Sequence, residues 1–225
     1  MCCLKIRLVI SSYAKFRNRR FLMIVKQIPV GSWEVFSYLI GDEKTREALV
    51  IDPGGDADLI VAEAEKENLN IKYIFNTHHH GDHTFGNGTL KKLTGAKIVI
   101  HELEDRFLKG DSKADIRLKD EKTFQLGEIT FRIFHTPGHS PGGICLYADG
   151  QLFTGDTLFV GDSGRTDLAG GHRLTLGASI RRLMELPDDT IIWPGHDYGP
   201  TPSSTIGHEK RTNINAREYG FYVKG

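Results

Sequence analysis

The sequence predicts a mixed α/β fold. After residue 22 the chain opens with short apolar runs separated by turn residues, a pattern typical of strands joined as a meander. An amphipathic stretch at residues 57–67 then precedes an apolar run at residues 71–75, so a helix leads into a strand. The second half contains further apolar runs that each end in a polar loop. These three observations together indicate helices layered on β-sheets.

The expected strands are short apolar runs separated by turn residues, and residues 57–67 carry apolar residues at helical spacing. The first half is expected to contain, in order, strands at 24–30, 33–40 and 47–51, a helix at 57–67, a strand at 71–75, a short helix at 85–94, a strand at 97–100 and a helix at 102–107. The polar residues 109–122 are expected to be irregular. The second half is expected to contain strands at 129–134, 143–147 and 151–153, a helix at 173–186, a strand at 190–193 and a terminal helix at 205–216.

Composition favours a single domain that acts on a small molecule. The 225 residues are 39% hydrophobic, enough for one sizeable core. Lys+Arg and Asp+Glu both number 29, so the formal charge is zero and neither nucleic acid nor an anionic membrane is an expected partner. Because no apolar run approaches the roughly 20 residues that span a bilayer, we expect a soluble protein. The sequence gives no prediction of the oligomeric state.

Cysteine content and the basic start of the chain bear on where the protein works. The three cysteines, Cys2, Cys3 and Cys145, cannot form a framework of bridges, which suits a reducing compartment such as the cytoplasm. Cys145 lies in an expected strand and is interpreted as a small core residue. Residues 1–22 are basic and contain no acidic residue. We interpret them as a leader that precedes the natural start near Met23, although an organellar transit peptide has a similar composition. Residues 23–225 then form the domain.

The most informative motif follows the expected strand at 71–75. Residues 77–83 read Thr-His-His-His-Gly-Asp-His. His78 and His80 are two residues apart, so in an extended segment their imidazoles project to the same side and can hold one metal ion together. Asp82 and His83 follow Gly81, which permits a sharp turn that brings a second pair of ligands close to the first. The spacing therefore predicts two adjoining metal sites.

Three later loops each offer one further ligand after an expected strand. These ligands are His139 in the loop at 136–143, Asp156 in Thr-Gly-Asp-Thr, and His196 in Pro-Gly-His-Asp. The flanking glycines and prolines allow the backbone to approach a buried ion closely and to hold the ligand on a fixed turn. A scaffold with a structural metal is the competing interpretation. Structural zinc sites are usually closed by four ligands, whereas seven clustered ligands leave room for water and substrate.

With these motifs in place, the chain resembles the metallo-β-lactamase superfamily over about residues 24–216. Its pattern of His-x-His-x-Asp-His, a lone histidine, an aspartate and a final histidine is present in full. The resemblance implies a four-layer αββα sandwich with metals at one edge. It also implies a division of the ligands, in which the first metal is bound by His78, His80 and His139, the second by Asp82, His83 and His196, and Asp156 bridges the two.

The same resemblance implies a metal-dependent hydrolase with two Zn²⁺, Fe or Mn ions per chain. Two metals about 3.5 to 4 Å apart share a water and lower its pKa, which supplies a bridging hydroxide as nucleophile without a Ser or Cys side chain. Asp156 and Asp82 are the expected catalytic carboxylates, the first as the bridge and the second as a group that orients the hydroxide.

Within the superfamily, two branches match different segments. Residues 152–159 and 194–198 are similar to glyoxalase II, the hydroxyacylglutathione hydrolases, which implies a glutathione thioester as substrate. Typical members of that branch continue into a long helical extension, whereas 29 of the 225 residues follow His196 here, so a different substrate pocket is expected. Residues 164–167, Gly-Arg-Thr-Asp, resemble persulfide dioxygenases. That alternative implies a single iron held by His78, His139 and Asp156, with Arg165 facing the substrate.

The remaining candidates concern substrate contacts and supporting groups. Arg165 and Tyr198 are the expected substrate contacts, because guanidinium suits a carboxylated substrate. For Lys210 and Arg211 a solvated helix face is favoured over the site. Asp52 is either a partner that orients a ligand imidazole or a turn residue before a proline, and both interpretations stay open. β-Lactamase activity and RNA processing are disfavoured, the first by His139 in a Gly-His-Ser-Pro loop and the second by the neutral charge.

Overall fold

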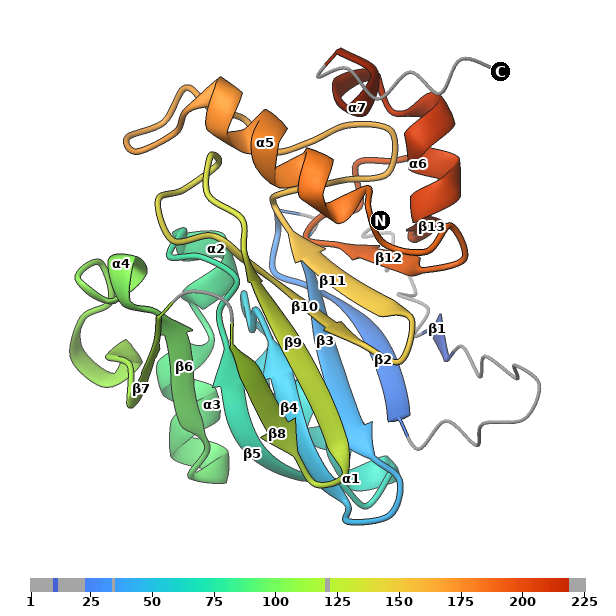
Figure 1. The fold of residues 1–225 in the computed structure, drawn as a ribbon. Coiled ribbons are helices and arrows are strands. Elements are labelled where there is room, and N and C mark those ends of the chain that lie inside the picture. Colours follow the sequence, from blue (N-terminus) through green and yellow to red (C-terminus); the bar gives the residue numbers. More distant parts are fainter. Residues whose placement is uncertain (1–9, 12–22, 34, 120–121, 219–225) are drawn as a thin grey trace, which may run out of the picture.

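A computed structural model describes residues 10–11, 23–33, 35–119 and 122–218 (Figure 1). Most of the leader predicted at residues 1–22 lies outside the described residues. Its one described element is strand β1 (Ile10–Ser11), which pairs with the edge of the first sheet. The division of the chain into a leader and a domain therefore stays a prediction.

The strands of the described chain form two mixed sheets. The first sheet follows chain order and contains β1, β2 (Met23–Val30), β3 (Val35–Asp42), β4 (Glu47–Ile51), β5 (Asn70–Phe75), β6 (Lys97–His101) and β7 (Ile116–Leu118). Strands β2 to β4 pair antiparallel as the predicted meander, and β4 to β7 pair parallel. The switch occurs where helix α1 (Ala57–Lys66) crosses between β4 and β5, since parallel neighbours need a crossover connection.

The second sheet is built from the second half of the chain. Its spatial order is β13 (Ser204–Thr205), β12 (Ile191–Pro194), β11 (Gln151–Gly155), β10 (Ile144–Ala148), β9 (Ile129–His135) and β8 (Thr123–Leu126). Only the β11–β12 pair is parallel among these strands, and helix α5 (Arg173–Leu183) lies between them in the sequence. Helices α6 (Ile206–Thr212) and α7 (Ile214–Glu218) follow β13.

Three groups of buried apolar residues separate four layers. The central group lies between the sheets and includes Tyr38 of β3 and Phe153 of β11. A second group packs α1 and α3 (Asn87–Thr94) on the outer face of the first sheet, and a third packs α5 and α6 on the outer face of the second. Adjacent residues Tyr38 and Leu39 face different groups, as the alternation of a strand requires. The predicted four-layer αββα sandwich is therefore confirmed.

The main differences from the sequence prediction are the additional strands β7 and β8 and a break in the terminal helix. Residues 109–122, expected to be irregular, contain β7, whose Leu118 packs in the central group. Strand β8 was not predicted, and it forms a hairpin with β9 through Gly127, which has a positive φ of 53°. Both strands are too short to show a clear alternation in the sequence.

The predicted terminal helix at 205–216 is divided at Asn213, which has an extended backbone. The Asn213 amide is buried and donates to the carbonyls of Phe159 and Asp162 at 3.3 and 2.9 Å, while its oxygen accepts from the backbone of Ala216 at 3.1 Å. This side chain begins α7 and anchors the 159–162 loop, so one long helix is not formed.

Cys145 lies on β10 and is fully buried. Its sulfur contacts the hydroxyl of Thr136 at 3.3 Å, and burial raises the pKa of the thiol to about 11. A protonated, enclosed thiol agrees with its interpretation as a core residue. Among the helices of the described residues, none combines the length and apolar character needed to cross a bilayer.

Candidate metal centre

The histidine-rich motif occupies the loop at the end of β5 and the start of helix α2 (Gly81–Thr84). His78 is buried and His80 is the residue before the helix, while Asp82 and His83 lie in the helix itself. Gly81 is thus the first helical residue and has no positive φ, so the expected sharp turn is replaced by a helical turn. The helix presents Asp82 and His83 next to the histidines of the loop.

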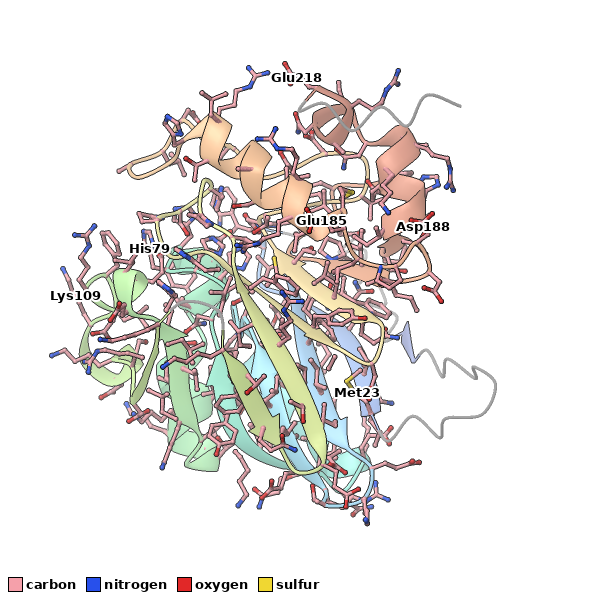
Figure 2. All side chains as sticks on the ribbon, viewed as in Figure 1. Met23, His79, Lys109, Glu185, Asp188 and Glu218 are labelled. Atoms are coloured by element: carbon pink, nitrogen blue, oxygen red, sulfur yellow. The ribbon has the colours of Figure 1, made fainter. Side chains whose placement is uncertain are left out.

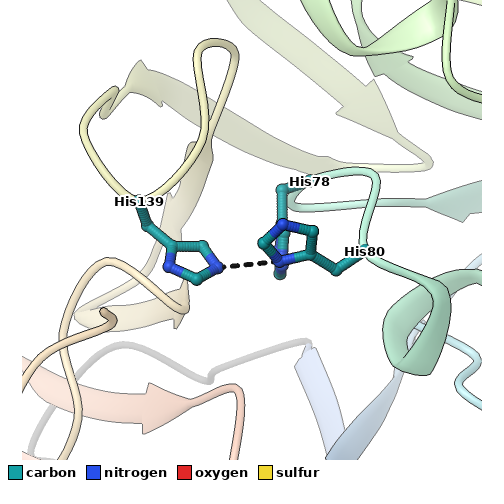
Figure 3. Close-up of side chains that lie close together, drawn as sticks. All are labelled: His78, His80 and His139. Carbon is teal, nitrogen blue, oxygen red and sulfur yellow. Dashed lines mark hydrogen bonds between the residues drawn. The ribbon is translucent and has the colours of Figure 1, made fainter. Parts of the chain in front are cut away.

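The first group of ligand atoms comes from His78, His80 and His139. The Nδ1 atom of His80 lies 3.0 Å from Nε2 of His78 and 3.0 Å from Nε2 of His139. Figure 3 shows His139 reaching across from its own loop toward the other two imidazoles. The two motif histidines therefore face one point together, as their spacing predicts.

The second group comes from Asp82, His83 and His196. The Nε2 atoms of His83 and His196 are 3.1 Å apart. The Oδ2 atom of Asp82 lies 3.5 Å from Nε2 of His196 and 3.7 Å from Nε2 of His83. His83 and His196 are buried, whereas the side chain of Asp82 is 26% exposed, so this group is open to solvent at the aspartate.

Asp156 lies between the two groups. Its Oδ2 atom is 3.5 Å from Nε2 of His139 in the first group and 3.5 Å from Nε2 of His196 in the second, and its Oδ1 atom is 3.3 Å from Nε2 of His83. Oδ1 is buried and has no hydrogen-bond partner in the described structure. The structure thus brings together all seven predicted ligands, and the Asp156 carboxylate lies within 3.5 Å of imidazoles from both groups.

Groups on the far side of each ring orient the imidazoles. Nδ1 of His139 lies 2.7 Å from the carbonyl oxygen of Arg165, and Nδ1 of His196 lies 2.9 Å from that of Trp33. A carbonyl only accepts, so each Nδ1 carries the proton and each Nε2 presents a lone pair. The Nε2 lone pairs of His139 and His196 point into the site, where a cation can accept them. The donor set therefore fits divalent metal ions.

Asp52 performs the same task for His83. Its Oδ2 atom accepts from Nδ1 of His83 at 3.0 Å and from the hydroxyl of Thr77 at 2.6 Å, and its Oδ1 accepts from the backbone of Thr77 at 2.7 Å. The Thr77 hydroxyl also lies 3.1 Å from Nδ1 of His78. Of the two open interpretations of Asp52, the structure places it as the partner of a ligand imidazole. It adopts a positive φ of 49° there.

Burial and nearby charges shift the pKa values of the motif histidines in different directions. Burial lowers the pKa of His78 well below its usual value and lowers that of His80 to about 4, so both rings are neutral at pH 7. Burial also opposes the charge on His83, but the carboxylates of Asp156 and Asp52 outweigh it and raise its pKa to about 9. In the metal-free protein His83 is therefore protonated, and a metal ion must displace that proton.

Glycines allow the backbone to pack against the ligands, as the sequence predicts for the loop that contains Gly195. A Cβ atom at Gly54 would lie 1.9 Å from the carbonyl oxygen of Asp82, and one at Gly195 would lie 2.4 Å from Oδ1 of Asp156. A Cβ atom at Gly164 would lie 2.0 Å from the backbone oxygen of Asp156. These three approaches leave no room for a larger residue.

The predicted substrate contacts lie at or near this site in different ways. Tyr198 stacks on the ring of His196 with centroids 4.4 Å apart and is 55% exposed. The guanidinium of Arg165 is exposed and pairs with Asp167 at 2.7 and 2.6 Å. The part of Arg165 that contacts the predicted metal ligand His139 is its backbone carbonyl. Lys210 pairs with Asp188 at 2.5 Å, on the opposite side of the view from His79 (Figure 2). Arg211 is exposed, which agrees with a solvated helix face, whereas the side chain of Lys210 is 22% exposed and lies against Asp188 rather than the metal ligands.

Comparison with known proteins places the chain among metalloenzymes. The sequence pattern of the metallo-β-lactamase superfamily matches residues 30–196. The hydroxyacylglutathione hydrolase GloC of Haemophilus influenzae is 38% identical over 210 residues, which cover 85% of this chain and 97% of that protein. The mitochondrial persulfide dioxygenase ETHE1 of Homo sapiens is 35% identical over 183 residues, covering 79% of this chain and 70% of that protein. The crystal structure of ETHE1 from Myxococcus xanthus superposes with a TM-score of 0.79 at 34% identity and 87% coverage of each chain.

Proposed function

The chain belongs to the metallo-β-lactamase superfamily, and we propose that it is a dinuclear metallohydrolase that cleaves glutathione-type thioesters. The observation that carries the proposal is the position of Asp156 between two complete groups of ligand atoms. The first ion would be held by His78, His80 and His139, and the second by Asp82, His83 and His196. Zinc is the expected metal, and iron or manganese would suit the same imidazole and carboxylate donors.

The chemistry divides between the ions and the protein. When bound, the two divalent ions would activate a water and polarise the carbonyl under attack. The chain itself holds the two groups at a fixed separation through Asp156 and keeps each buried imidazole in one tautomer. Asp82 is the most exposed of the carboxylates at the site, so it is placed to accept a hydrogen bond from the attacking water and orient it. A thiolate, whose thiol has a pKa of about 8.5, leaves without a strong general acid.

The substrate class rests on similarity and on the rim of the site. A relative named as a hydroxyacylglutathione hydrolase matches nearly along its whole length, which supports a glutathione thioester. We propose that Tyr198 contacts the substrate, because its exposed ring stacks on the ligand His196. Arg165 is the proposed partner of a substrate carboxylate and would have to leave Asp167 to reach it. The neutral overall charge agrees with a small molecule rather than nucleic acid, and we propose that the protein acts in the cytoplasm.

A second candidate function is supported by a relative of nearly equal similarity. A persulfide dioxygenase is 35% identical, and residues 164–167 resemble that branch. This activity would use one iron at His78, His139 and Asp156, so it requires only part of the ligand set. The second group would then be idle, although it is as well ordered by hydrogen bonds as the first.

Paired assays on one preparation test the proposal. Protein stripped with a chelator is reloaded with zinc or with iron, and each sample is given S-lactoylglutathione or glutathione persulfide with oxygen. The hydrolase proposal predicts metal-dependent loss of the thioester and no oxygen uptake. Oxygen uptake by the iron-loaded protein, without thioester cleavage, would replace it with the dioxygenase.

A second-group variant separates the two functions further. Asp82→Asn should remove most of the thioesterase rate, because one ligand of the second ion and the orienting carboxylate are lost together. A single-iron dioxygenase would keep most of its activity. Asp188→Asn is the matched control, since Asp188 is an exposed carboxylate paired with Lys210 and touches none of the ligands. Its activity should equal that of the unaltered protein.

A further inference from the structure

A buried carboxylate outside the ligand set joins the two loops that carry the first group. Glu104 lies on the short helix α4 (Glu102–Asp105), which follows β6, and its residue is fully buried. Its Oε2 atom accepts a hydrogen bond from the ring Nδ1 of His79 and one from the backbone nitrogen of His79 at 3.2 Å. Its Oε1 atom accepts from the backbone nitrogen of Gly142. One side chain therefore uses each of its oxygens on a different loop.

Those two loops supply all three histidines of the first group. His79 stands between His78 and His80, and Gly142 is three residues beyond His139. The loop of Gly142 packs so closely on α4 that a Cβ atom at Gly142 would lie 2.8 Å from Cγ of Glu104. Glu104 therefore joins the two loops beside their imidazoles, in addition to the backbone hydrogen bond from Ile144 to the carbonyl of Thr77 at 2.9 Å.

The His79 side chain is fixed on the α4 side and away from the ligand atoms. Its ring stacks on Phe107 with centroids 3.9 Å apart and an interplanar angle of 18°. Figure 2 labels His79 on the side of the molecule where α4 follows β6. The middle histidine of the motif thus contacts Glu104 while its two neighbours face the site, as alternation along an extended segment requires.

We propose that Glu104 is a positioning residue for the first metal, holding the loop at 76–80 and the loop at 136–143 at the distance where their three imidazoles converge. The inference rests on the metal-binding part of the proposed function and is independent of the substrate. The second group is held instead by Asp52 and by the carbonyl of Trp33. Loss of Glu104 should therefore act on the first metal and spare the second.

The variant Glu104→Gln tests this placement. The amide keeps the size of the side chain but replaces one acceptor oxygen with an NH₂ group, which opposes the donors of one loop. Purified protein is stripped and titrated with Co²⁺ against a competing chelator, and the two binding steps are followed by the visible absorption of the bound ion. We expect a loss of about 10- to 100-fold in affinity at one step, by analogy with other groups that orient metal ligands. The other step should be unchanged.

Glu209→Gln is the matched control for a loss of stability. Glu209 is equally buried and accepts from Gly161 at 2.8 Å and from Asn213 at 2.8 Å, but it joins no loop that carries a histidine of the first group. This variant should lower the melting temperature while both Co²⁺ steps stay as in the unaltered protein. Wild-type Co²⁺ affinity in Glu104→Gln, or an equal loss at both steps, would overturn the inference.

A milder variant covers the case in which Glu104→Gln does not fold. His79→Ala removes the ring donor and leaves both backbone donors to Glu104 in place, so a smaller loss confined to the same Co²⁺ step is expected. No change in either step would count against the proposal. If the unaltered protein binds two Co²⁺ ions but cleaves no thioester, the substrate proposal fails alone. If it binds none, both fail.

Discussion

Replacing Asp52 with asparagine should weaken the second metal by changing a tautomer. In Asp52 both oxygens accept, one of them from Nδ1 of His83 at 3.0 Å. If the amide oxygen of an asparagine stays on the backbone N–H of Thr77, its NH₂ group faces His83. Nδ1 of His83 must then accept, and the ring proton moves to Nε2, the atom that points at His196. A protonated Nε2 has no lone pair for a metal.

The expected size follows from comparable groups in other metal sites. Loss of a partner that orients a ligand histidine typically costs 10- to 100-fold in metal affinity, or about 1.4 to 2.8 kcal/mol. The assay is a competition titration with Zn²⁺ and a chelator at fixed pH. Asp42→Asn is the control, because Asp42 is equally buried and accepts from the backbone of Lys44 and Thr45 at 2.8 and 3.1 Å, outside the ligand set. It should destabilise the fold without changing metal affinity. Unchanged affinity in Asp52→Asn would refute the tautomer argument.

Three further predictions concern the metal-free protein, the buried thiol and a close backbone approach. The pKa of His83 is raised to about 9, so its contribution to stability is complete below pH 6.5 and is lost as the pH rises toward 9. The pKa of His80 is lowered to about 4, so its contribution to stability is complete above pH 6.5 and is lost as the pH falls toward 4. The free energy of unfolding of chelated protein, measured in urea, should therefore peak near pH 6.5, and a steady rise to pH 9 would contradict this. Cys145, with a pKa of about 11, should resist iodoacetamide at pH 8 until the protein is unfolded, as peptide mass spectrometry would show. Gly54→Ala should displace α2 and lower the affinity for the second metal at least about tenfold. Gly55→Ala is the control, because its Cβ would meet its nearest atom at 3.4 Å, and it should bind metal normally. Equal Zn²⁺ affinity of the two variants would count against the packing argument.

The metal ligands that lie in short sequence motifs could be predicted from the sequence. His78 and His80 are two residues apart, and Asp156 follows a strand within a glycine-bounded turn, so residue type and spacing were enough to select them. The structure brings them together with the later ligands. The division into two groups came from a resemblance, because the sequence contains no distances between loops.

The features that sequence analysis missed depend on tertiary contacts. Trp33 and Arg165 orient ligand rings through their backbone carbonyls, and a carbonyl has no residue-type signature. Glu104 resembled any charged residue on a short helix until its burial was known. Asn213 was assigned to the interior of a helix, since nothing local shows that its amide binds the 159–162 loop.

The central claim is that two ions act together at one site, and a metal titration of activity tests it most directly. Zn²⁺ is added in steps to stripped protein, and hydrolysis of S-lactoylglutathione is measured at each step. The proposed dinuclear site predicts a rate that continues to rise until two equivalents per chain are bound. A rate that reaches its maximum at one equivalent, or a fully loaded protein that cleaves no thioester, would contradict the account.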